Sequence, residues 1–574
     1  MKGKRPIQEE WLPKLILSLR GYTRKDFTAD LTAGLTVGLV ALPLAMAFGI
    51  ASGVTPQAGI YTAVVAGFLI SALGGSKTQI GGPTGAFVVV IAGIIARHGL
   101  SGLLMVTMMA GAMLILLGAT GLGNAVKFIP RPVIIGFTNG IAVLIASTQI
   151  RDFLGITSVE KMPAEFIERM AYLAHHISAT QATTLLLSLA SLAVILITPR
   201  LTRRVPGSII AMAAATLAVA AFGVPVETIG SRFGGIPTGL PSFTVPEFRT
   251  DLIVPLLPSA VTVALLAAIE SLLSAVVADS MSGDRHNSNV ELIAQGIANL
   301  TTPLVGGIPV TGAIARTATN IRSGARSPLS GIIHALTLLC ILLFAAPLAR
   351  YIPLSALAAV LFVVAWNMGE WREIPMILRL DAKEIVVWLI TFLLTVVADL
   401  TIAVEVGMTL AALLYIYQVS RTTVVAPLTE DTIEKARAHI LHDRSIPHYI
   451  AMFHIQGPFL FGAAEKLNNL VQDVETLPPV IILRLRYMTA IDATGLHAIE
   501  QFHESLQSAG RQLILCGSRG QPKRLIYTSQ LPRSIGARNI LPNINAALNR
   551  AADIHERFNG IGEEFAHDLA EAPA

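Results

Sequence analysis

The chain has 574 residues, of which 53% are hydrophobic and 14% are charged. Because roughly a quarter of the residues in ordinary globular proteins are charged, this composition excludes a wholly soluble protein. The formal net charge of +5 is small for the length and suits lysines and arginines that face anionic lipid, not a nucleic-acid partner. The two cysteines predict neither a disulfide framework nor a metal site.

Residues 1–30 form a basic segment without a cleavable hydrophobic stretch. We therefore expect a retained flank and not a signal peptide. The positive-inside rule places this N-terminus in the cytoplasm. The basic residues of the segment are Lys2, Lys4, Arg5, Lys14, Arg20, Arg24 and Lys25.

Residues 31–420 are expected to form a membrane domain. Uncharged runs cover Leu31–Ser76, Thr78–Ala96, Gly99–Val126 and Leu252–Ile269. Runs of roughly 18 apolar residues or more are typical of helices that span a bilayer, and their continuity differs from the alternating pattern of a barrel. We expect about fourteen spans in an all-α domain, counting short and broken helices.

Two weak internal echoes suggest a duplication. "IGGPTGAF" and "GGIPVTGAI" share a Thr-Gly-Ala context at Gly85 and Gly312, and 312 − 85 gives 227. "FIPRPVIIGF" begins at Phe128 and "YIPLSALAAV" at Tyr351, and 351 − 128 gives 223. The similar offsets predict about seven spans in each half. Repeats with an odd number of spans enter the membrane in opposite senses, as in the inverted repeats of secondary transporters.

The first echo also predicts two broken helices. Glycine permits unusual backbone conformations, and proline suits the first turn of a helix. Each break would then precede a helix N-terminus with free amides and roughly half a positive charge. Two such N-termini that converge near the bilayer midplane form an anion receptor. The alternative is a pair of ordinary turns, but the matched spacing favours broken helices.

Arg316 is isolated in an apolar region. It lies one helical turn after Gly312 and follows 24 uncharged residues. An arginine at depth costs roughly 2.5 to 3.5 kcal/mol on insertion scales, so we expect its planar guanidinium to face the anion. The alternative is that it reaches an interface or pairs only with Glu270 or Glu291.

Glu270 is the second isolated charge, with eighteen uncharged residues before it and eight after it. A carboxyl group in such surroundings can bind a proton, and Ser274, one turn later, can share its helix face. Both are candidate coupling residues. The alternative is a static ion pair between two helices. Two helix N-termini, Arg316 and ionised Glu270 sum to about +1, which suits a monoanion, or a dianion when Glu270 is protonated.

The composition changes after about residue 420. We expect a linker over residues 421–445, a soluble domain over residues 446–558 and a loose acidic tail over residues 559–574. The soluble domain alternates strand, helix, strand, helix and strand in "YIAMFHI", "AAEKLNNLVQDVE", "VIILRLRY", "TGLHAIEQFHESLQSAG" and "RQLILCG", as a small α/β layer does. An even number of spans places it in the cytoplasm.

Three blocks of the chain resemble the sulfate permease (SulP) family of anion transporters, whose animal relatives include prestin. They are "GLTVGLVALPLAMAFGIASGVTPQAGIYTAVVAGFLISALGGSKTQIGGPTGAF", "ESLLSAVVADSMSGDRHNSNVELIAQGIANL" and "GGIPVTGAIARTATNIRSGA", followed by a STAS-like domain. The resemblance covers nearly the whole chain. It implies a seven-plus-seven inverted repeat divided into a core and a gate domain, an elevator-type movement and usually a dimer.

The resemblance also implies a set of site residues. Glu270 falls on the acidic position of the eighth span. Sodium-coupled relatives lack the arginine and place a hydroxyl residue at the position of Ile314, so we expect coupling to protons, not to sodium. Leu44 stands where many relatives have a polar residue, which weakens any contact from that side. The implied anion pocket comprises Phe48 from the first span, Thr84, Gly85 and Ala86 from the third, and Ala315 and Arg316 from the tenth.

The STAS resemblance centres on "LRLRYMTAIDATGLHAI". Anti-sigma-factor antagonists of similar fold have a phosphorylated serine where this chain has Ala493, so that switch is absent. Thr494 has a hydroxyl group that can be modified, but we expect it to cap a helix instead. We assign this domain to assembly, folding or regulation, including the binding of a cytoplasmic protein partner.

These observations predict a homodimeric secondary transporter of small inorganic anions in the bacterial inner (cytoplasmic) membrane, with both termini cytoplasmic. Sulfate and bicarbonate are the leading substrates, dicarboxylates remain open, and both proton symport and anion exchange fit. We expect no enzyme activity, cofactor, metal or nucleic-acid partner. The alternatives are a proton-coupled nucleobase permease and a membrane-anchored STAS scaffold or sensor.

Overall fold

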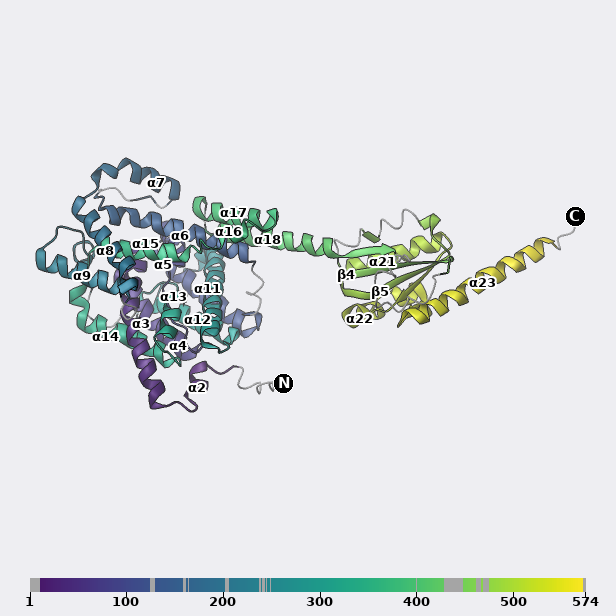
Figure 1. The fold of residues 1–574 in the computed structure, drawn as a ribbon, viewed down its shortest axis with the longest axis horizontal. Helices are drawn as coiled ribbons and strands as arrows, with labels where there is room; N and C mark the ends of the chain where they lie inside the picture. Colours follow the sequence, from purple (N-terminus) through teal and green to yellow (C-terminus); the bar gives the residue numbers. More distant parts are fainter. Residues whose placement is uncertain are drawn as a thin grey trace. The chain divides into compact units, whose positions relative to one another are not determined.

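The computed structural model describes residues 11–123, 130–157, 162–163, 165–201, 206–236, 239, 243, 245–247, 249–398, 400–427, 447–460, 466–467 and 474–570. The chain divides into two compact units, Met1–Leu410 and Ala411–Ala574. Figure 1 labels their main helices and strands.

The first unit is helical, as predicted. Seven of its described helices are long and apolar enough to cross a membrane, and shorter apolar helices accompany them. The helices are α2 (Lys14–Leu19), α3 (Arg24–Ala51), α4 (Pro56–Leu73), α5 (Gly85–Ala119), α6 (Arg131–Leu154), α7 (Phe166–His175), α8 (Ala182–Leu201), α9 (Gly207–Phe222), α10 (Ile229–Phe233), α11 (Ile253–Ser282), α12 (Ser288–Thr301), α13 (Ile314–Arg322), α14 (Leu329–Ala349), α15 (Leu354–Met368), α16 (Ile374–Ile377), α17 (Ala382–Val397) and α18 (Leu400–Thr422).

The element order matches a seven-plus-seven arrangement. Gly99 has a φ of 67° and divides α5 into two helices. Within the described residues, α3, α4, the two parts of α5, α6, α8 and α9 make seven, and α11 to α15 with α17 and α18 make another seven. The first part of α5 and α13, which follow the two glycine-proline breaks, are each third in their set. The helices α6 and α15, which follow the second echo, are each fifth; Phe128 itself lies outside the described residues.

The membrane helices pack in two groups. The core group contains α3, α4, α5, α11, α12, α13 and α14, and the gate group contains α6, α8, α9, α15 and α17. Glycines permit the close contacts within the core group. A Cβ atom at Gly34 of α3 would lie 2.5 Å from the carbonyl oxygen of Ser330, and one at Gly296 of α12 would lie 2.6 Å from that of Gly111 in α5. Small residues at such crossings are typical of membrane helix pairs.

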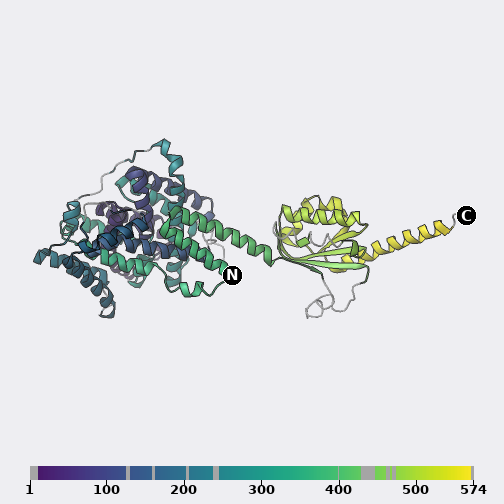
Figure 2. The ribbon, with the colours of Figure 1, turned by 90° about the horizontal axis from the view of Figure 1, so that it is seen from above.

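The second unit is the predicted α/β domain. Its strands are β3 (Val424–Pro427), β4 (Ile450–Phe459), β5 (Val480–Ile491), β6 (Gln512–Cys516) and β7 (Ile540–Leu541), and its helices are α21 (Ala493–Ser508), α22 (Gly520–Thr528) and α23 (Ile544–Ala570). The strands pair in the order β3-β4-β5-β6-β7. The pair β3–β4 is antiparallel, and the other pairs are parallel. Figure 2 shows the helices beside this sheet.

Both faces of the sheet are buried within this unit. On β5, Ile481 and Leu483 contribute to the cluster that contains Phe502 of α21, whereas Ile482 contributes to the cluster that contains Ala547 of α23. The alternation follows the two-residue period of a strand. Because side chains of β5 are buried on both faces of the sheet, apolar residues follow one another almost without interruption in "VIILRLRY".

The C-terminal part differs from the sequence prediction at its last helix and at one helix cap. The predicted helix over residues 463–475 lies mostly outside the described residues. The tail is expected to be loose from residue 559, but it is helical as far as Ala570, where α23 ends. The cap of α21 is Asp492, whose Oδ1 accepts a 2.8 Å hydrogen bond from the amide of Gly495. The assignment of the cap to Thr494 is wrong, since that residue already lies within the first turn.

Candidate functional site

The two glycine-proline breaks meet. The short strands β1 (Gly81–Gly82) and β2 (Thr311–Gly312) pair in antiparallel fashion, with Gly81 opposite Gly312 and Gly82 opposite Thr311. The amide of Ala313 also donates a 2.8 Å hydrogen bond to the carbonyl of Ile80. Because α5 begins at Gly85 and α13 at Ile314, both helices start directly beyond this paired segment.

A buried serine of α11 holds β2 in place. Ser271 Oγ accepts a 3.1 Å hydrogen bond from the amide of Gly312 and lies 2.8 Å from Thr311 Oγ1. Thr311 Oγ1 in turn donates to the carbonyl of Ala267 at 3.0 Å. These contacts fix the break between α12 and α13 to the middle of α11. Ser271 and Thr311 were not predicted, although hydroxyl residues beside a break in an apolar run are a usable signal.

A second buried hydroxyl, Thr317 of α13, joins the two breaks. Its Oγ1 accepts hydrogen bonds from the amide of Ile80 at 3.0 Å and from Ser274 Oγ at 3.1 Å. Ser274 lies one turn after Glu270, as predicted, but its hydroxyl is directed to Thr317. Its predicted role in coupling therefore has a competing structural explanation.

Arg316 is buried between the two breaks, with 2% of its surface exposed. Its Nη2 atom donates to the carbonyl of Pro83, at the other break. Its Nη1 atom is buried and makes no hydrogen bond within the described residues. This burial argues against an arginine that reaches the membrane surface. Glu291 has other partners, because it accepts hydrogen bonds from the amide of Gly75 and from Gln295 Nε2.

Gly82 leaves room for the guanidinium. Its φ of 148° is a conformation that favours glycine, and a Cβ atom at this position would lie 2.6 Å from Arg316 Nη1. The backbone of the first break therefore packs directly against the arginine of the second. The double glycine in "IGGPTGAF" is explained by this close approach as well as by the turn.

Thr84 and Glu270 connect the beginning of α5 to α11. Thr84 Oγ1 donates a 2.8 Å hydrogen bond to Glu270 Oε2, and both residues are partly exposed. Glu270 and Arg316 attract each other electrostatically, without a direct ion pair between these two described side chains. The structure thus gives Thr84 a carboxylate partner in addition to its predicted place in the anion pocket.

The remaining predicted residues surround the two helix beginnings. A Cβ atom at Gly85 would lie 3.3 Å from Phe48 Cε1, 3.1 Å from Ile145 Cδ1 and 2.8 Å from Met368 Sδ. Ile145 and Met368 are contacts that the sequence did not predict, because they belong to helices of the gate group. Ala86, in the first turn of α5, is buried at 1% exposure.

The beginning of α13 is more accessible than that of α5. Ala315 is exposed, and Ile314 is exposed over 39% of its surface. Both lie at the start of the helix, directly before the buried Arg316. The start of α13 is therefore less covered by protein than the start of α5.

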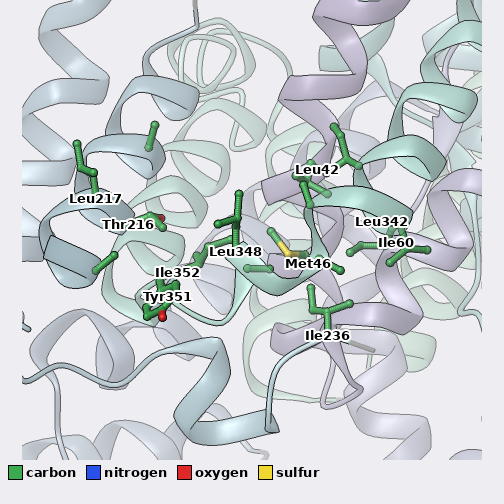
Figure 3. Close-up of a pocket in the computed structure, with 16 residues that line it drawn as sticks. Leu42, Met46, Ile60, Thr216, Leu217, Ile236, Leu342, Leu348, Tyr351 and Ile352 are labelled. Carbon is green, nitrogen blue, oxygen red and sulfur yellow. The ribbon is translucent and has the colours of Figure 1, made fainter. Parts of the chain in front are cut away.

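A cavity of about 400 Å³ lies elsewhere in the membrane unit and is shown in Figure 3. Among its described lining residues, only Thr216 and Tyr351 carry polar side-chain atoms, and none is charged. Buried apolar walls of this kind do not stabilise an anion. None of the predicted site residues lines this cavity, so we do not assign the transported solute to it.

The junction of the breaks has the electrostatics of an anion site. Two helix N-termini contribute roughly half a positive charge each, and Arg316 and Glu270 add one charge of each sign. Within the described residues, no cluster of three or more histidine, cysteine, aspartate or glutamate side chains can hold a metal ion. The arrangement suits the binding of a small anion by amides and fixed charge.

Comparisons with known proteins identify the family. Residues 27–391 match the sulfate permease family, and residues 443–547 match the STAS domain. The chain is 43% identical over 520 residues to YvdB of Bacillus subtilis (strain 168), covering 90% of this chain and 96% of that protein. It is 32% identical over 513 residues to the bicarbonate transporter BicA of Synechocystis sp., covering 86% and 89%.

Solved structures show the same fold. The structure of murine Solute Carrier 26 family member A9, an anion transporter in the inward-facing state, matches with a TM-score of 0.85 and 17% identity and covers 96% of each chain. The relatives named as acting on a solute are transporters, not enzymes. The chain belongs to the sulfate permease family, and it is a polytopic membrane transporter with a C-terminal STAS domain.

Proposed function

We propose that this protein is a secondary active transporter that binds a small inorganic anion between the beginnings of α5 and α13. The observation that carries the proposal is the pairing of β1 with β2 beside a buried arginine. Free amides at two helix N-termini and a guanidinium then act on one small volume. A nucleobase permease or a membrane-anchored scaffold gives no comparable reason for a buried arginine beside two paired breaks.

Arg316 acts from behind the site in this proposal. Its Nη2 atom bonds the carbonyl of Pro83, so the guanidinium holds the two breaks together while its charge acts on the anion. At the front, the proposed contacts of the anion are the amides beside the exposed Ile314 and Ala315 and the partly exposed Thr84. The predicted pocket residues Phe48, Gly85 and Ala86 form the wall of the site on the side of α3 and α5.

Sulfate and bicarbonate are the proposed substrates. The family description names sulfate and a named relative transports bicarbonate. The charge at the site is about +1 with Glu270 ionised and about +2 with Glu270 protonated. Bicarbonate fits the first condition and sulfate fits the second. This difference supports sulfate transport that is coupled to a proton on Glu270. Exchange for another anion is the second proposed mode.

Movement of the core group against the gate group would expose the site to each side in turn. The site residues of α3, α5, α11 and α13 all belong to the core group, whereas Ile145 and Met368 of the gate group pack against Gly85. Apolar contacts between the groups can be exchanged at little cost when one group slides. We also propose a homodimer with cytoplasmic termini, as the family resemblance implies, in a bacterial cytoplasmic membrane.

Transport by purified protein in liposomes tests the proposal. Uptake of labelled sulfate, bicarbonate, fumarate and uracil is measured at two pH values for the wild-type protein and for Arg316→Gln. We expect saturable uptake of sulfate or bicarbonate that Arg316→Gln reduces at least tenfold. Uracil uptake without anion uptake, or no uptake of any solute, contradicts the proposal.

A further inference from the structure

A second cavity of about 580 Å³ lies between the core and gate groups. Its walls include Val88–Val90, Ala92–Ile94, Ala96 and Arg97 of α5 from the core group, and Leu144 and Thr148 of α6 from the gate group. Unlike the apolar cavity in Figure 3, it has charged and hydroxyl groups in its lining. These are Arg97, Thr148, Glu165, Arg169 and Ser259.

This cavity begins one helical turn beyond the proposed anion site. Val88 lies three residues after Gly85, or about 4.5 Å along the axis of α5. Ala51, which also lines the cavity, lies three residues after Phe48 on α3. The contacts of Phe48, Ile145 and Met368 around Gly85 therefore stand at the inner end of the cavity.

The cavity is at the end of the membrane unit opposite to the N-terminal segment. The helix α3 starts at Arg24 next to that segment, and its last residue, Ala51, lines the cavity. Twenty-eight helical residues extend about 42 Å. With the N-terminus in the cytoplasm, as proposed above, the cavity opens toward the outside of the cell.

Two arginines bring positive charge to this space. Arg97 is exposed, and its side chain folds back along α5, so that a Cβ atom at Gly93 would lie 3.7 Å from its Nη2 atom. Arg169 is only 4% exposed, and its Nη1 atom donates a 2.9 Å hydrogen bond to Ser147 Oγ of α6. With Glu165 ionised, the three charged side chains among the described lining residues sum to +1. A concave surface with low-dielectric walls concentrates such a field.

We propose that this cavity is an outer anion-binding vestibule, in which Arg97 and Arg169 collect the small inorganic anion before it reaches the site between α5 and α13. The inference deepens the proposed function and rests on it. The arginines affect binding from the outside and leave the movement of the core group unchanged. The hydroxyl group of Ser259 adds a hydrogen-bond donor for the oxygen atoms of the anion, whereas the hydroxyl of Thr148 already donates to the carbonyl of Ile145.

Sided transport measurements with Arg97→Gln test the vestibule. The concentration dependence of sulfate and bicarbonate transport is measured in right-side-out cells and in inverted membrane vesicles. We expect the KM for entry from the outside to rise about threefold to tenfold because the steering field is weakened, with unchanged maximal rate and unchanged KM from the inside. Arg350→Gln is the matched control, since Arg350 is an exposed arginine at the end of α14, which runs parallel to α3, and it is not among the residues that line the cavity.

A variant that makes the cavity more positive provides a stricter test, because it should change the outside KM in the opposite direction. Glu165→Gln changes the sum of the three charges from +1 to +2, so the outside KM is expected to fall. Arg169→Lys keeps the charge that produces the steering field, so its outside KM is expected to stay within about twofold of the wild type. An unchanged outside KM in Arg97→Gln, equal changes on both sides, or a rise in Glu165→Gln overturns the vestibule. If the wild type transports neither anion, the proposed function itself fails, which is a different result.

Discussion

The hydroxyl of Thr84 donates a 2.8 Å hydrogen bond to Oε2 of Glu270, and this contact joins the beginning of α5 to the middle of α11. The carboxyl group accepts in this contact, so its affinity for a proton depends on whether Thr84 is present. Arg316 acts on the same carboxyl group by electrostatic attraction. The pair therefore connects the helix start, which is proposed to bind the anion, with the group that is proposed to bind the proton.

Replacement of Glu270 by glutamine is expected to abolish the pH dependence of transport. Glutamine keeps the shape and can accept from Thr84, but it has no charge to gain or lose. In the wild type, sulfate uptake should fall as pH rises through the range in which Glu270 loses its proton, because the site charge drops from about +2 to about +1. This is checked by initial rates of sulfate uptake measured from about pH 5 to about pH 8, the range between the usual pKa of a carboxyl group and values above that of histidine. A wild-type pH profile retained in Glu270→Gln contradicts it.

The hydrogen bond itself is tested with Thr84→Val. Valine has nearly the same shape but no donor, so Glu270 loses a partner worth about 1.5 to 3 kcal/mol when it is charged. We expect the pH profile of uptake to move toward higher pH and the rate at neutral pH to change about tenfold or more. Thr84→Ser should restore the wild-type profile. Equal behaviour of the valine and serine variants would show that the contact has no part in transport.

Gly82→Ala is expected to stop transport by displacing Arg316. A Cβ atom there would lie 2.6 Å from Nη1 of the guanidinium, and the φ of 148° adds a strain of about 1 to 3 kcal/mol. Gly53→Ala is a matched control, because Gly53 also has a positive φ, of 82°, but a Cβ atom there meets nothing within 4 Å.

Thermal unfolding and anion uptake are measured for both glycine variants. Both should lose some stability, and only Gly82→Ala should lose transport in protein that remains folded. Similar transport by the two variants would argue against the close approach of Gly82 to Arg316 as a functional contact.

In the C-terminal unit, Asp492→Ala should lower stability more than Thr494→Ala. Asp492 caps α21 through its 2.8 Å contact with the amide of Gly495, and the loss of such a cap costs about 1 kcal/mol, within a range of 0.5 to 2. Denaturant unfolding of the full-length protein, followed by a probe in the STAS domain, gives both values. A larger loss in Thr494→Ala would restore the cap that the sequence predicted.

Much of the site could be predicted because its signals are local. Gly85 and Gly312 share a motif at a repeated offset, and Arg316 interrupts a run of 24 uncharged residues. The contact of Arg316 with the carbonyl of Pro83 could not be predicted, since every residue has a carbonyl and none is marked in the sequence. The contacts of Met368 with Gly85 depend on how the gate group packs against the core group, which no local pattern determines.

The C-terminal unit shows the same limit at shorter range. The strands and helices there follow from the alternation of apolar residues, and both faces of β5 are buried as its continuous apolar run suggests. The prediction of Thr494 as the helix cap fails because Thr and Asp both favour caps, so residue type does not separate Thr494 from Asp492. The choice depends on the residue at which β5 ends, and boundaries of one or two residues are the least certain part of such a prediction.

The most direct test is a structure determined with selenate, a heavier analogue of sulfate, bound to the wild-type protein and located by its anomalous signal. We expect the selenium between the beginnings of α5 and α13, with the selenate oxygen atoms about 3 Å from amides near Gly85 and Ala315. Selenate found only in another cavity, with these amides bonded to protein groups, would contradict an anion site between α5 and α13.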